Sequence, residues 1–282
     1  MAQMSGARSA AAGLSAAALI LLAACAQLGG SAPGGGFTPG GTVSSASPSS
    51  PDNPQKALLT AAVAAQRITS AVETIHVSYA GAAGRAATGT IRFRLKPAVR
   101  VSENLRTTVN GRSTRIKAIL TAQAIYLDAA AMGVAVGKPW VKISLTALKG
   151  TGVAQIVQGI QSNSFRDQVQ LPAYARDAHV AGTQTIDGVC TTEYAGSFRF
   201  ADAYNAMPAS LRKALATQAQ QLGNSVVRFR EWVDGQHHVR QLTEIEPVDG
   251  TVATVTVNIN AINQPVQITL PPASEVTTQP AS

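Results

Sequence analysis

The chain has few charged residues, few aromatic residues and almost no cysteine. Charged residues make up 13% of its 282 residues and aromatic residues 5%, and the two cysteines are Cys25 and Cys190. Two cysteines cannot supply the dense disulfide framework of a small secreted scaffold. The chain is instead long enough to bury a sizeable core, and its many Ala, Val, Thr and Gly residues fit a globular, β-rich domain.

Sequence signatures of common enzymes are also missing. The chain contains no G-x-S-x-G, no P-loop, no dinucleotide fingerprint and no H-E-x-x-H. The histidines are His76, His179, His237 and His238. His237 and His238 would point to opposite faces of a strand, and they follow the turn Asp234-Gly235. We therefore expect a hairpin tip in solvent rather than a metal site, and we expect no enzyme activity, metal or cofactor.

Carboxylates and tryptophans give no stronger signal of catalysis. Glu231 and Asp234 flank Trp232, and we interpret them as the approach to a turn rather than as a catalytic pair. Trp232 and Trp140 are expected to be packing residues, with ligand stacking as the alternative.

The first 24 residues predict a secretory signal. Arg8 precedes an apolar run from Ala10 to Leu22. The small residues Ala23 and Ala24 follow and stand directly before Cys25, which gives the motif Leu22-Ala23-Ala24-Cys25. This sequence resembles a bacterial lipobox, in which the cysteine thiol takes a diacylglycerol and the peptide is cut before it. A transmembrane helix is the alternative, but alanine inserts weakly and Gly, Ser and Pro follow. We expect a lipoprotein that is anchored by acyl chains, such as palmitate, on Cys25 at the extracytoplasmic face of the cell membrane.

Lipid on Cys25 would leave Cys190 without a disulfide partner. We expect Cys190 to be a small buried hydrophobic residue, with a reactive thiol as the alternative. Residues 25–51 comprise the lipidated cysteine and a flexible Gly-, Ser- and Pro-rich linker with a reach of about 25–30 Å. A single domain over residues 52–276 and a loose tail at 277–282 complete the expected organisation.

Hydrophobic periodicity predicts two long helices in an otherwise β-rich domain. The helices are expected at Asp52–Ser70 and Asp202–Leu222, with further helical sequence from Ser144 to about Gln170. Asn110-Gly111, Asp187-Gly188 and Asp249-Gly250 signal tight hairpins. The expected strands are Thr74–Tyr79, Thr88–Lys96, Val99–Leu105, Ser113–Thr121, Ala124–Asp128, Lys138–Ile143, Ala178–Ile186, Thr191–Phe200, Ser225–Val233, His238–Pro247, Thr251–Asn260 and Pro265–Leu270.

Basic residues gather on two of these strands, in a chain of formal net charge +8. Arg92, Arg94 and Lys96 alternate with apolar residues, and Arg112, Arg115 and Lys117 form a second group. For a tethered protein, the natural partner of such a surface is an anionic membrane, and a merely solvated strand face is the alternative. Nucleic acid is not expected, because the chain is exported and has no aromatic-basic binding motif.

Four stretches together resemble the LppX/LprAFG lipoproteins of actinobacteria. They are Lys138-Pro139-Trp140-Val141-Lys142-Ile143, the segment Gly182 to Tyr194 with its Asp187-Gly188 turn, Glu231-Trp232-Val233-Asp234, and Gln264 to Pro272. The resemblance covers roughly residues 52–276 and includes the order of lipobox, linker, helix and strands. It implies an α+β fold similar to LolA/LolB, a half-open antiparallel β-barrel whose helices pack on the concave face. It also implies carriage of an acylated lipid.

The resulting hypothesis is a lipoprotein that binds or carries a lipid or lipoglycan in an apolar cavity. Strand parity selects ten candidate lining residues, which would form an ordinary core if the interior were filled: Ile91, Phe93, Val141, Ile143, Phe198, Val227, Phe229, Val255, Val257 and Ile259. The alternative function is that of a solid-core surface lipoprotein that binds a protein partner, whose identity the sequence does not give.

Overall fold

The structure, a computed structural model, describes residues 53–81, 85–130, 137–146, 165–248 and 251–278. The predicted signal peptide, Cys25, the linker, most of the helical stretch after Ser144 and the Asp249-Gly250 turn lie outside these ranges. Within the described ranges, no helix has the length and apolar character needed to cross a membrane.

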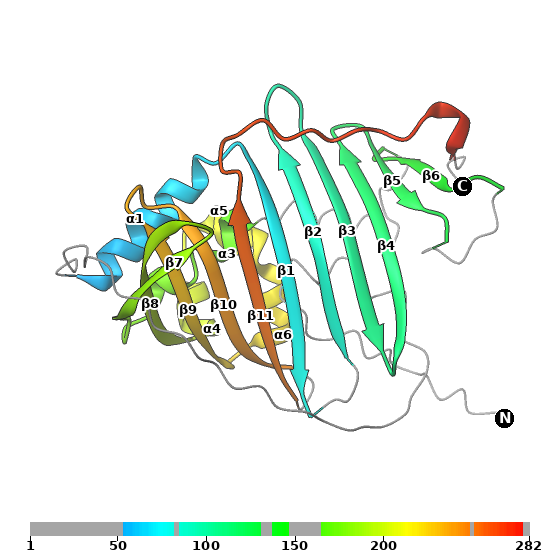
Figure 1. Cartoon of the computed structure of the whole chain (residues 1–282). Coiled ribbons are helices and arrows are strands. Elements are labelled where there is room, and N and C mark those ends of the chain that lie inside the picture. Colours follow the sequence, from blue (N-terminus) through cyan, green and yellow to red (C-terminus); the bar gives the residue numbers. More distant parts are fainter. Residues whose placement is uncertain (1–52, 82–84, 131–136, 147–164, 249–250, 279–282) are drawn as a thin grey trace, which may run out of the picture.

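All strands of the described ranges belong to one open, curved sheet of twelve strands (Figure 1). The spatial order is β12-β6-β5-β4-β3-β2-β1-β11-β10-β9-β8-β7, and every pairing is antiparallel except β12 with β6. The strands are β1 (Ser70–Ala80), β2 (Ala86–Arg94), β3 (Arg100–Val109), β4 (Arg112–Thr121), β5 (Ala124–Asp128), β6 (Trp140–Ser144), β7 (His179–Ile186), β8 (Val189–Arg199), β9 (Val226–Asp234), β10 (Val239–Val248), β11 (Thr251–Asn260) and β12 (Val276–Thr278).

Short helices pack against one face of this sheet, which we call the inner face. They are α1 (Pro54–Gln66), α3 (Phe165–Gln168), α4 (Phe200–Ala206), α5 (Ala209–Ala214) and α6 (Ala216–Leu222), with the 3₁₀ turns η2 (Pro172–Tyr174) and η3 (Ala273–Glu275) elsewhere. Leu58 of α1, Phe200 of α4 and Leu215 before α6 are fully buried. They share one hydrophobic cluster with inner-face residues of β1, β2 and β8–β11. In Figure 1, α4–α6 (yellow) lie behind β9–β11.

A second hydrophobic cluster covers the inner face of β3–β6. It consists of Leu105, Ile116, Ala118, Leu120, Ile125, Leu127, Ala129, Val141 and Ile143, with Val101 and Leu145 packed at its border. Every described member comes from these strands or the residues next to them. The described helices therefore pack against only one half of the inner face.

The chain after β11 crosses the outer face of the sheet. Val266 and Ile268 pack with Ile119 of β4, and Val72, Tyr126 and Trp140 border this third cluster. Arg100 donates a hydrogen bond from its guanidinium to the Ile268 carbonyl oxygen at 2.8 Å. The segment then reaches β6, where β12 adds in parallel (Figure 1).

These observations correct several predictions. The sheet is mixed rather than antiparallel, because β12 is parallel to β6. Pro265–Leu270 forms no strand, since its alternating apolar residues pack on the outer face without joining the ladder. The residues Val276–Thr278 form β12 where a loose tail from 277 was expected, because the unpaired edge of β6 offers them a partner.

The two predicted helices are shorter than their patterns suggest. The first ends at Gln66, and Ser70 already begins β1. The second is divided into α4, α5 and α6, because Pro208 cannot continue the helix that ends at Ala206. Two hairpins are confirmed with both central residues at positive φ: Asn110 (53°) and Gly111 (75°), and Asp187 (49°) and Gly188 (80°).

Cys190 is exposed and does not pack in the core as predicted. It pairs with Thr185, one step from the Asp187-Gly188 turn of the β7–β8 hairpin at the edge of the sheet.

Gly89 of β2 provides a test of the inner packing. A Cβ atom there would meet the side chain of Leu105 and lie 2.5 Å from the Asn104 carbonyl oxygen and 2.8 Å from Leu105 Cα. We expect Gly89→Ala to lower the free energy of unfolding by about 1–3 kcal/mol in urea titrations. Gly182→Ala is the matched control, because nothing lies within 4 Å of its added Cβ. Equal effects of the two variants would contradict this packing.

Candidate functional site

The ten residues that strand parity selected all lie buried on the inner face. Eight of them share the first hydrophobic cluster with the helices, and Val141 and Ile143 belong to the second. Phe198 and Phe229 pack with their ring centroids 6.1 Å apart. Their common face and burial are as expected, while their role as lipid contacts stays a prediction.

The inner face also carries a set of buried carboxyl groups. Each is between 0 and 3% exposed, and each occupies a strand position whose neighbours two residues away are mostly apolar. They are Glu73 on β1, Glu103 on β3, Glu231 on β9, and Glu244 and Glu246 on β10. Burial of this many carboxyls is unusual, because Glu is almost never fully buried without a partner.

Three of the carboxyls lie close together on β9 and β10. Glu231 pairs across the sheet with Leu242, and Glu244 follows Leu242 on the same face of β10, next to Phe229. Electrostatic repulsion couples Glu231 to Glu244, and Glu244 to Glu246. Both carboxyl oxygens of Glu231 and one of Glu244 have no hydrogen-bond partner among the described residues.

The other two carboxyls flank a single isoleucine. Ile91 of β2 pairs with Glu73 on one side and with Glu103 on the other. One carboxyl oxygen of Glu103 is buried without a hydrogen-bond partner among the described residues. The two groups of carboxyls therefore border apolar residues on the same face of the sheet.

Burial is the main reason that these carboxyls hold their protons strongly. It raises the pKa of Glu73 to about 8, with repulsion from Glu103 adding to the effect. It raises the pKa of Glu103 to about 7 and that of Glu244 to about 8. The pKa of Glu231 is raised well above its ordinary value by burial and then by Glu244. At neutral pH, Glu73 and Glu244 are thus mostly protonated.

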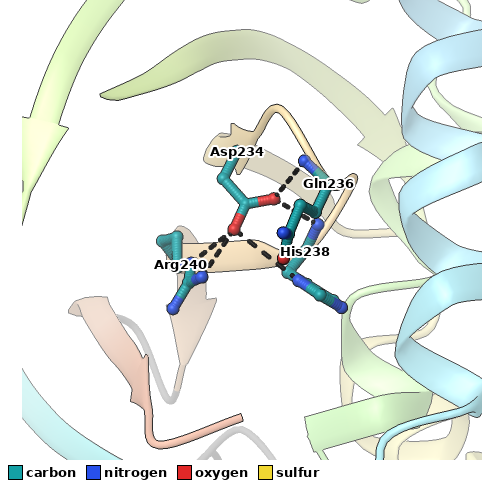
Figure 2. Close-up of polar contacts among 4 residues, drawn as sticks. All are labelled: Asp234, Gln236, His238 and Arg240. Carbon is teal, nitrogen blue, oxygen red and sulfur yellow. Dashed lines mark hydrogen bonds and ion pairs between the residues drawn. The ribbon is translucent and has the colours of Figure 1, made fainter. Parts of the chain in front are cut away.

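Carboxylates on the other side of the sheet are satisfied by basic partners. Glu193 accepts a hydrogen bond from Arg230 at 2.6 Å. Asp234 accepts hydrogen bonds from Arg240 at 2.7 Å and from the backbone amides of Gln236 and His238 at 2.8 and 2.9 Å (Figure 2). Glu193 and Asp234 therefore differ from Glu231, whose two carboxyl oxygens have no hydrogen-bond partner among the described residues.

The histidine pair lies at the turn that Asp234 holds together. His237 is exposed at a positive φ of 63°, and His238 Nδ1 lies 3.6 Å from the Asp234 carboxylate (Figure 2). In the described part of the chain, no group of three or more His, Cys, Asp or Glu residues is placed to hold a metal. Trp232 is buried, with the Arg230 guanidinium 5.4 Å from its ring centroid.

The buried glutamates are the functional candidates that the sequence analysis missed. Glu231 was interpreted as the approach to a turn, but it is fully buried on the inner face. The signal was present in strand parity. Glu73 stands between Ala71 and Ile75, and Glu231 between Phe229 and Val233, so each occupies an inward position.

Solved structures similar to this chain include two mycobacterial lipoproteins. LprF from Mycobacterium bovis is 12% identical, covers 79% of this chain and 99% of its own, and superposes with a TM-score of 0.49. Lipoprotein LppX from Mycobacterium tuberculosis is 15% identical, covers 78% and 100%, and has a TM-score of 0.46. Both names belong to the group of lipoproteins that the sequence motifs resemble.

MucB of Pseudomonas aeruginosa, solved in complex with MucA, is more distant. It is 14% identical over 76% of this chain and 58% of its own, with a TM-score of 0.35. No protein-family model and no curated protein matches the chain.

The raised pKa values make stability depend on pH. A carboxyl whose pKa is higher in the folded than in the unfolded chain binds its proton more tightly when folded. Its contribution is complete below about pH 4.5 and is lost as the pH rises toward 8. We expect the free energy of unfolding to fall between pH 5 and pH 8, because each such carboxyl then loses its proton more readily in the unfolded than in the folded chain.

Urea titrations of variants test whether the buried carboxyls cause this pH dependence of the free energy of unfolding. Glu73→Gln and Glu244→Gln should each make the pH dependence less steep, because an amide does not titrate in this range. Glu193→Gln is the matched control and should keep the full slope, since the inner-face carboxyls remain. A stability that rises from pH 5 to pH 8 would contradict the account.

Proposed function

We propose that the protein is a membrane-tethered lipoprotein that binds or carries an acylated lipid between its sheet and its helices. In this proposal the inner face is the concave face of the curved sheet. Cys25 would supply the anchor at the extracytoplasmic face of the cell membrane, and the linker would give the domain room to move. The function is binding, not catalysis.

The observation that carries the proposal is a largely apolar inner face that extends beyond the described helices. Ile91 and Phe93 on β2 belong to the first cluster, and Leu105 on β3 and Ile125 on β5 belong to the second. The described helices pack against only the first. An acyl chain gains roughly 0.8 kcal/mol for each CH₂ that leaves water, so a long apolar face suits such a ligand. The family resemblance implies the same cargo.

A protein-binding lipoprotein with a filled interior remains the second candidate. The packing of the first cluster favours it, because Leu58, Phe200 and Leu215 from three helical segments are fully buried against the sheet. Ligand binding separates the two candidates, since a filled interior would take up no lipid.

The outer face of β3 and β4 supports contact with an anionic membrane. Arg106 and Arg115 lie directly opposite each other, and Lys117 lies on the same face next to Asn104. Both arginines are exposed. Two like charges in direct opposition do not stabilise a sheet, so a phosphate-bearing surface is a reasonable partner for them.

Lipid binding is tested with the delipidated mature protein and a fluorescent diacylglycerol presented in vesicles. We expect uptake of the probe, and we expect Val257→Thr to weaken binding about tenfold, because a hydroxyl would face the acyl chain. Val252→Thr on the same strand is the matched control, since Val252 is exposed and Val257 is buried. Absence of uptake, or equal affinities for the two variants, would contradict the proposal.

Membrane contact is tested by flotation with vesicles of defined charge, using protein that lacks the lipid anchor. Arg106→Ala and Arg115→Ala should each weaken binding to anionic vesicles about fivefold, because a basic residue near such a surface contributes about 1 kcal/mol. Added salt should weaken the wild type in the same way. Lys56→Ala, which removes an exposed charge on α1, is the control. Equal binding to neutral and anionic vesicles would exclude this role.

A further inference from the structure

The first hydrophobic cluster, to which residues of α6, β9 and β10 belong, is bordered by polar atoms without partners from two separate parts of the chain. On the sheet they are both carboxyl oxygens of Glu231 and one of Glu244. On the helix side the atom is the amide oxygen of Gln218, a residue that is only 3% exposed. None of these oxygens accepts a hydrogen bond from a described residue.

Gln218 lies on the buried face of α6. It lies three residues after Leu215 and four before Leu222, so the three side chains share one face of α6. Leu215 and Leu222 belong to the hydrophobic cluster that also contains Phe229 and Leu242, the cross-strand neighbours of Glu244 and Glu231. The helix therefore adds an independent buried polar group to the hydrophobic cluster that the two carboxyls border.

Leaving these oxygens unpartnered is costly. A buried acceptor that lacks a donor costs about 1–3 kcal/mol, and such groups are rare in native proteins. Three residues in one interior indicate that a bound group completes their hydrogen bonds. Leu, Val or Phe at these positions would otherwise stabilise the fold more.

The unpartnered oxygens determine which kind of group can bind there. All the unpartnered atoms are oxygens, so the ligand must supply hydrogen-bond donors. The surrounding residues are apolar, so the donors must belong to a molecule that is otherwise hydrophobic. A phosphate or carboxylate is disfavoured, because burial already disfavours negative charge at this place. The raised pKa of Glu231 keeps its carboxyl neutral, and a neutral carboxyl can exchange hydrogen bonds with a hydroxyl.

We propose that Glu231, Glu244 and Gln218 form an interior site for the uncharged, hydroxyl-bearing polar group of an acylated lipid. This inference rests on the proposed lipid binding and specifies its ligand class. The site selects a glyceride or sugar hydroxyl over an anionic headgroup that is attached to the same acyl chains.

Competition between lipids with identical acyl chains tests the selectivity. The delipidated mature protein is loaded with the fluorescent diacylglycerol, which is then displaced by dioleoylglycerol, by dioleoylphosphatidic acid or by a dioleoyl trimethylammonium lipid. We expect dioleoylglycerol to displace the probe at a concentration at least about tenfold lower than either charged lipid. Preference for the ammonium lipid would overturn the inference in favour of a cation site.

Variants of Glu231 separate a binding role from a structural one. Glu231→Leu removes both unpartnered oxygens, so it should raise or maintain the free energy of unfolding while it abolishes the preference for dioleoylglycerol. Glu231→Gln keeps an acceptor and should retain the preference. A merely structural glutamate would show the opposite pattern, with lost stability and unchanged selectivity.

The outcomes distinguish the two proposals. If all three lipids displace the probe equally, the protein binds lipid but the hydroxyl site is wrong. If the probe itself never binds, the proposed function fails and this inference fails with it.

Discussion

Successive residues of a β-strand point to opposite faces, and this alternation decides which side chains of the sheet meet the helices. In most of the strands the inward positions hold Val, Ile, Leu, Phe or Ala, and they form the two inner clusters. Five inward positions hold glutamate instead. The glutamates cannot turn to solvent without moving a whole strand out of register, so the fold keeps them in an apolar place and shifts their protonation.

The two faces of the sheet differ in the partners of their charged and titratable groups. On the outer face, Arg230 and Arg240 pair with Glu193 and Asp234, and Arg106 and Arg115 are exposed. On the inner face, burial raises the pKa of Glu73 and Glu231, and both carboxyl oxygens of Glu231 have no hydrogen-bond partner among the described residues. A basic outer face and a neutral, acceptor-rich inner face suit a protein that approaches an anionic membrane and takes an uncharged lipid from it.

Periodicity predicted most of the sheet because side chains two residues apart share an environment. Ala124–Asp128 and Thr251–Asn260 were predicted with their observed bounds, and the Asn110-Gly111 hairpin was confirmed by its positive φ angles. The parallel pairing of β12 was not predictable, because it depends on a segment that crosses the outer face before it reaches β6. Local sequence contains no information about such a distant partner.

Sequence predicted the apolar residues of the candidate site but not its buried polar residues. Parity identified the ten apolar residues, since burial and apolar character agree there. For Glu231 the two signals disagree, and residue type suggested a turn while parity indicated the core. Gln218 gave no signal at all, because its burial depends on how three short helices pack after Pro208.

Infrared spectroscopy of the folded protein tests the central claim most directly, because protonated carboxyls absorb apart from carboxylates. The account predicts a protonated-carboxyl band that persists at pH 6, where ordinary glutamates are ionised, and that loses intensity in Glu231→Gln and Glu244→Gln. A spectrum at pH 6 that contains only carboxylate bands would show that the inner face is charged, and would contradict the account.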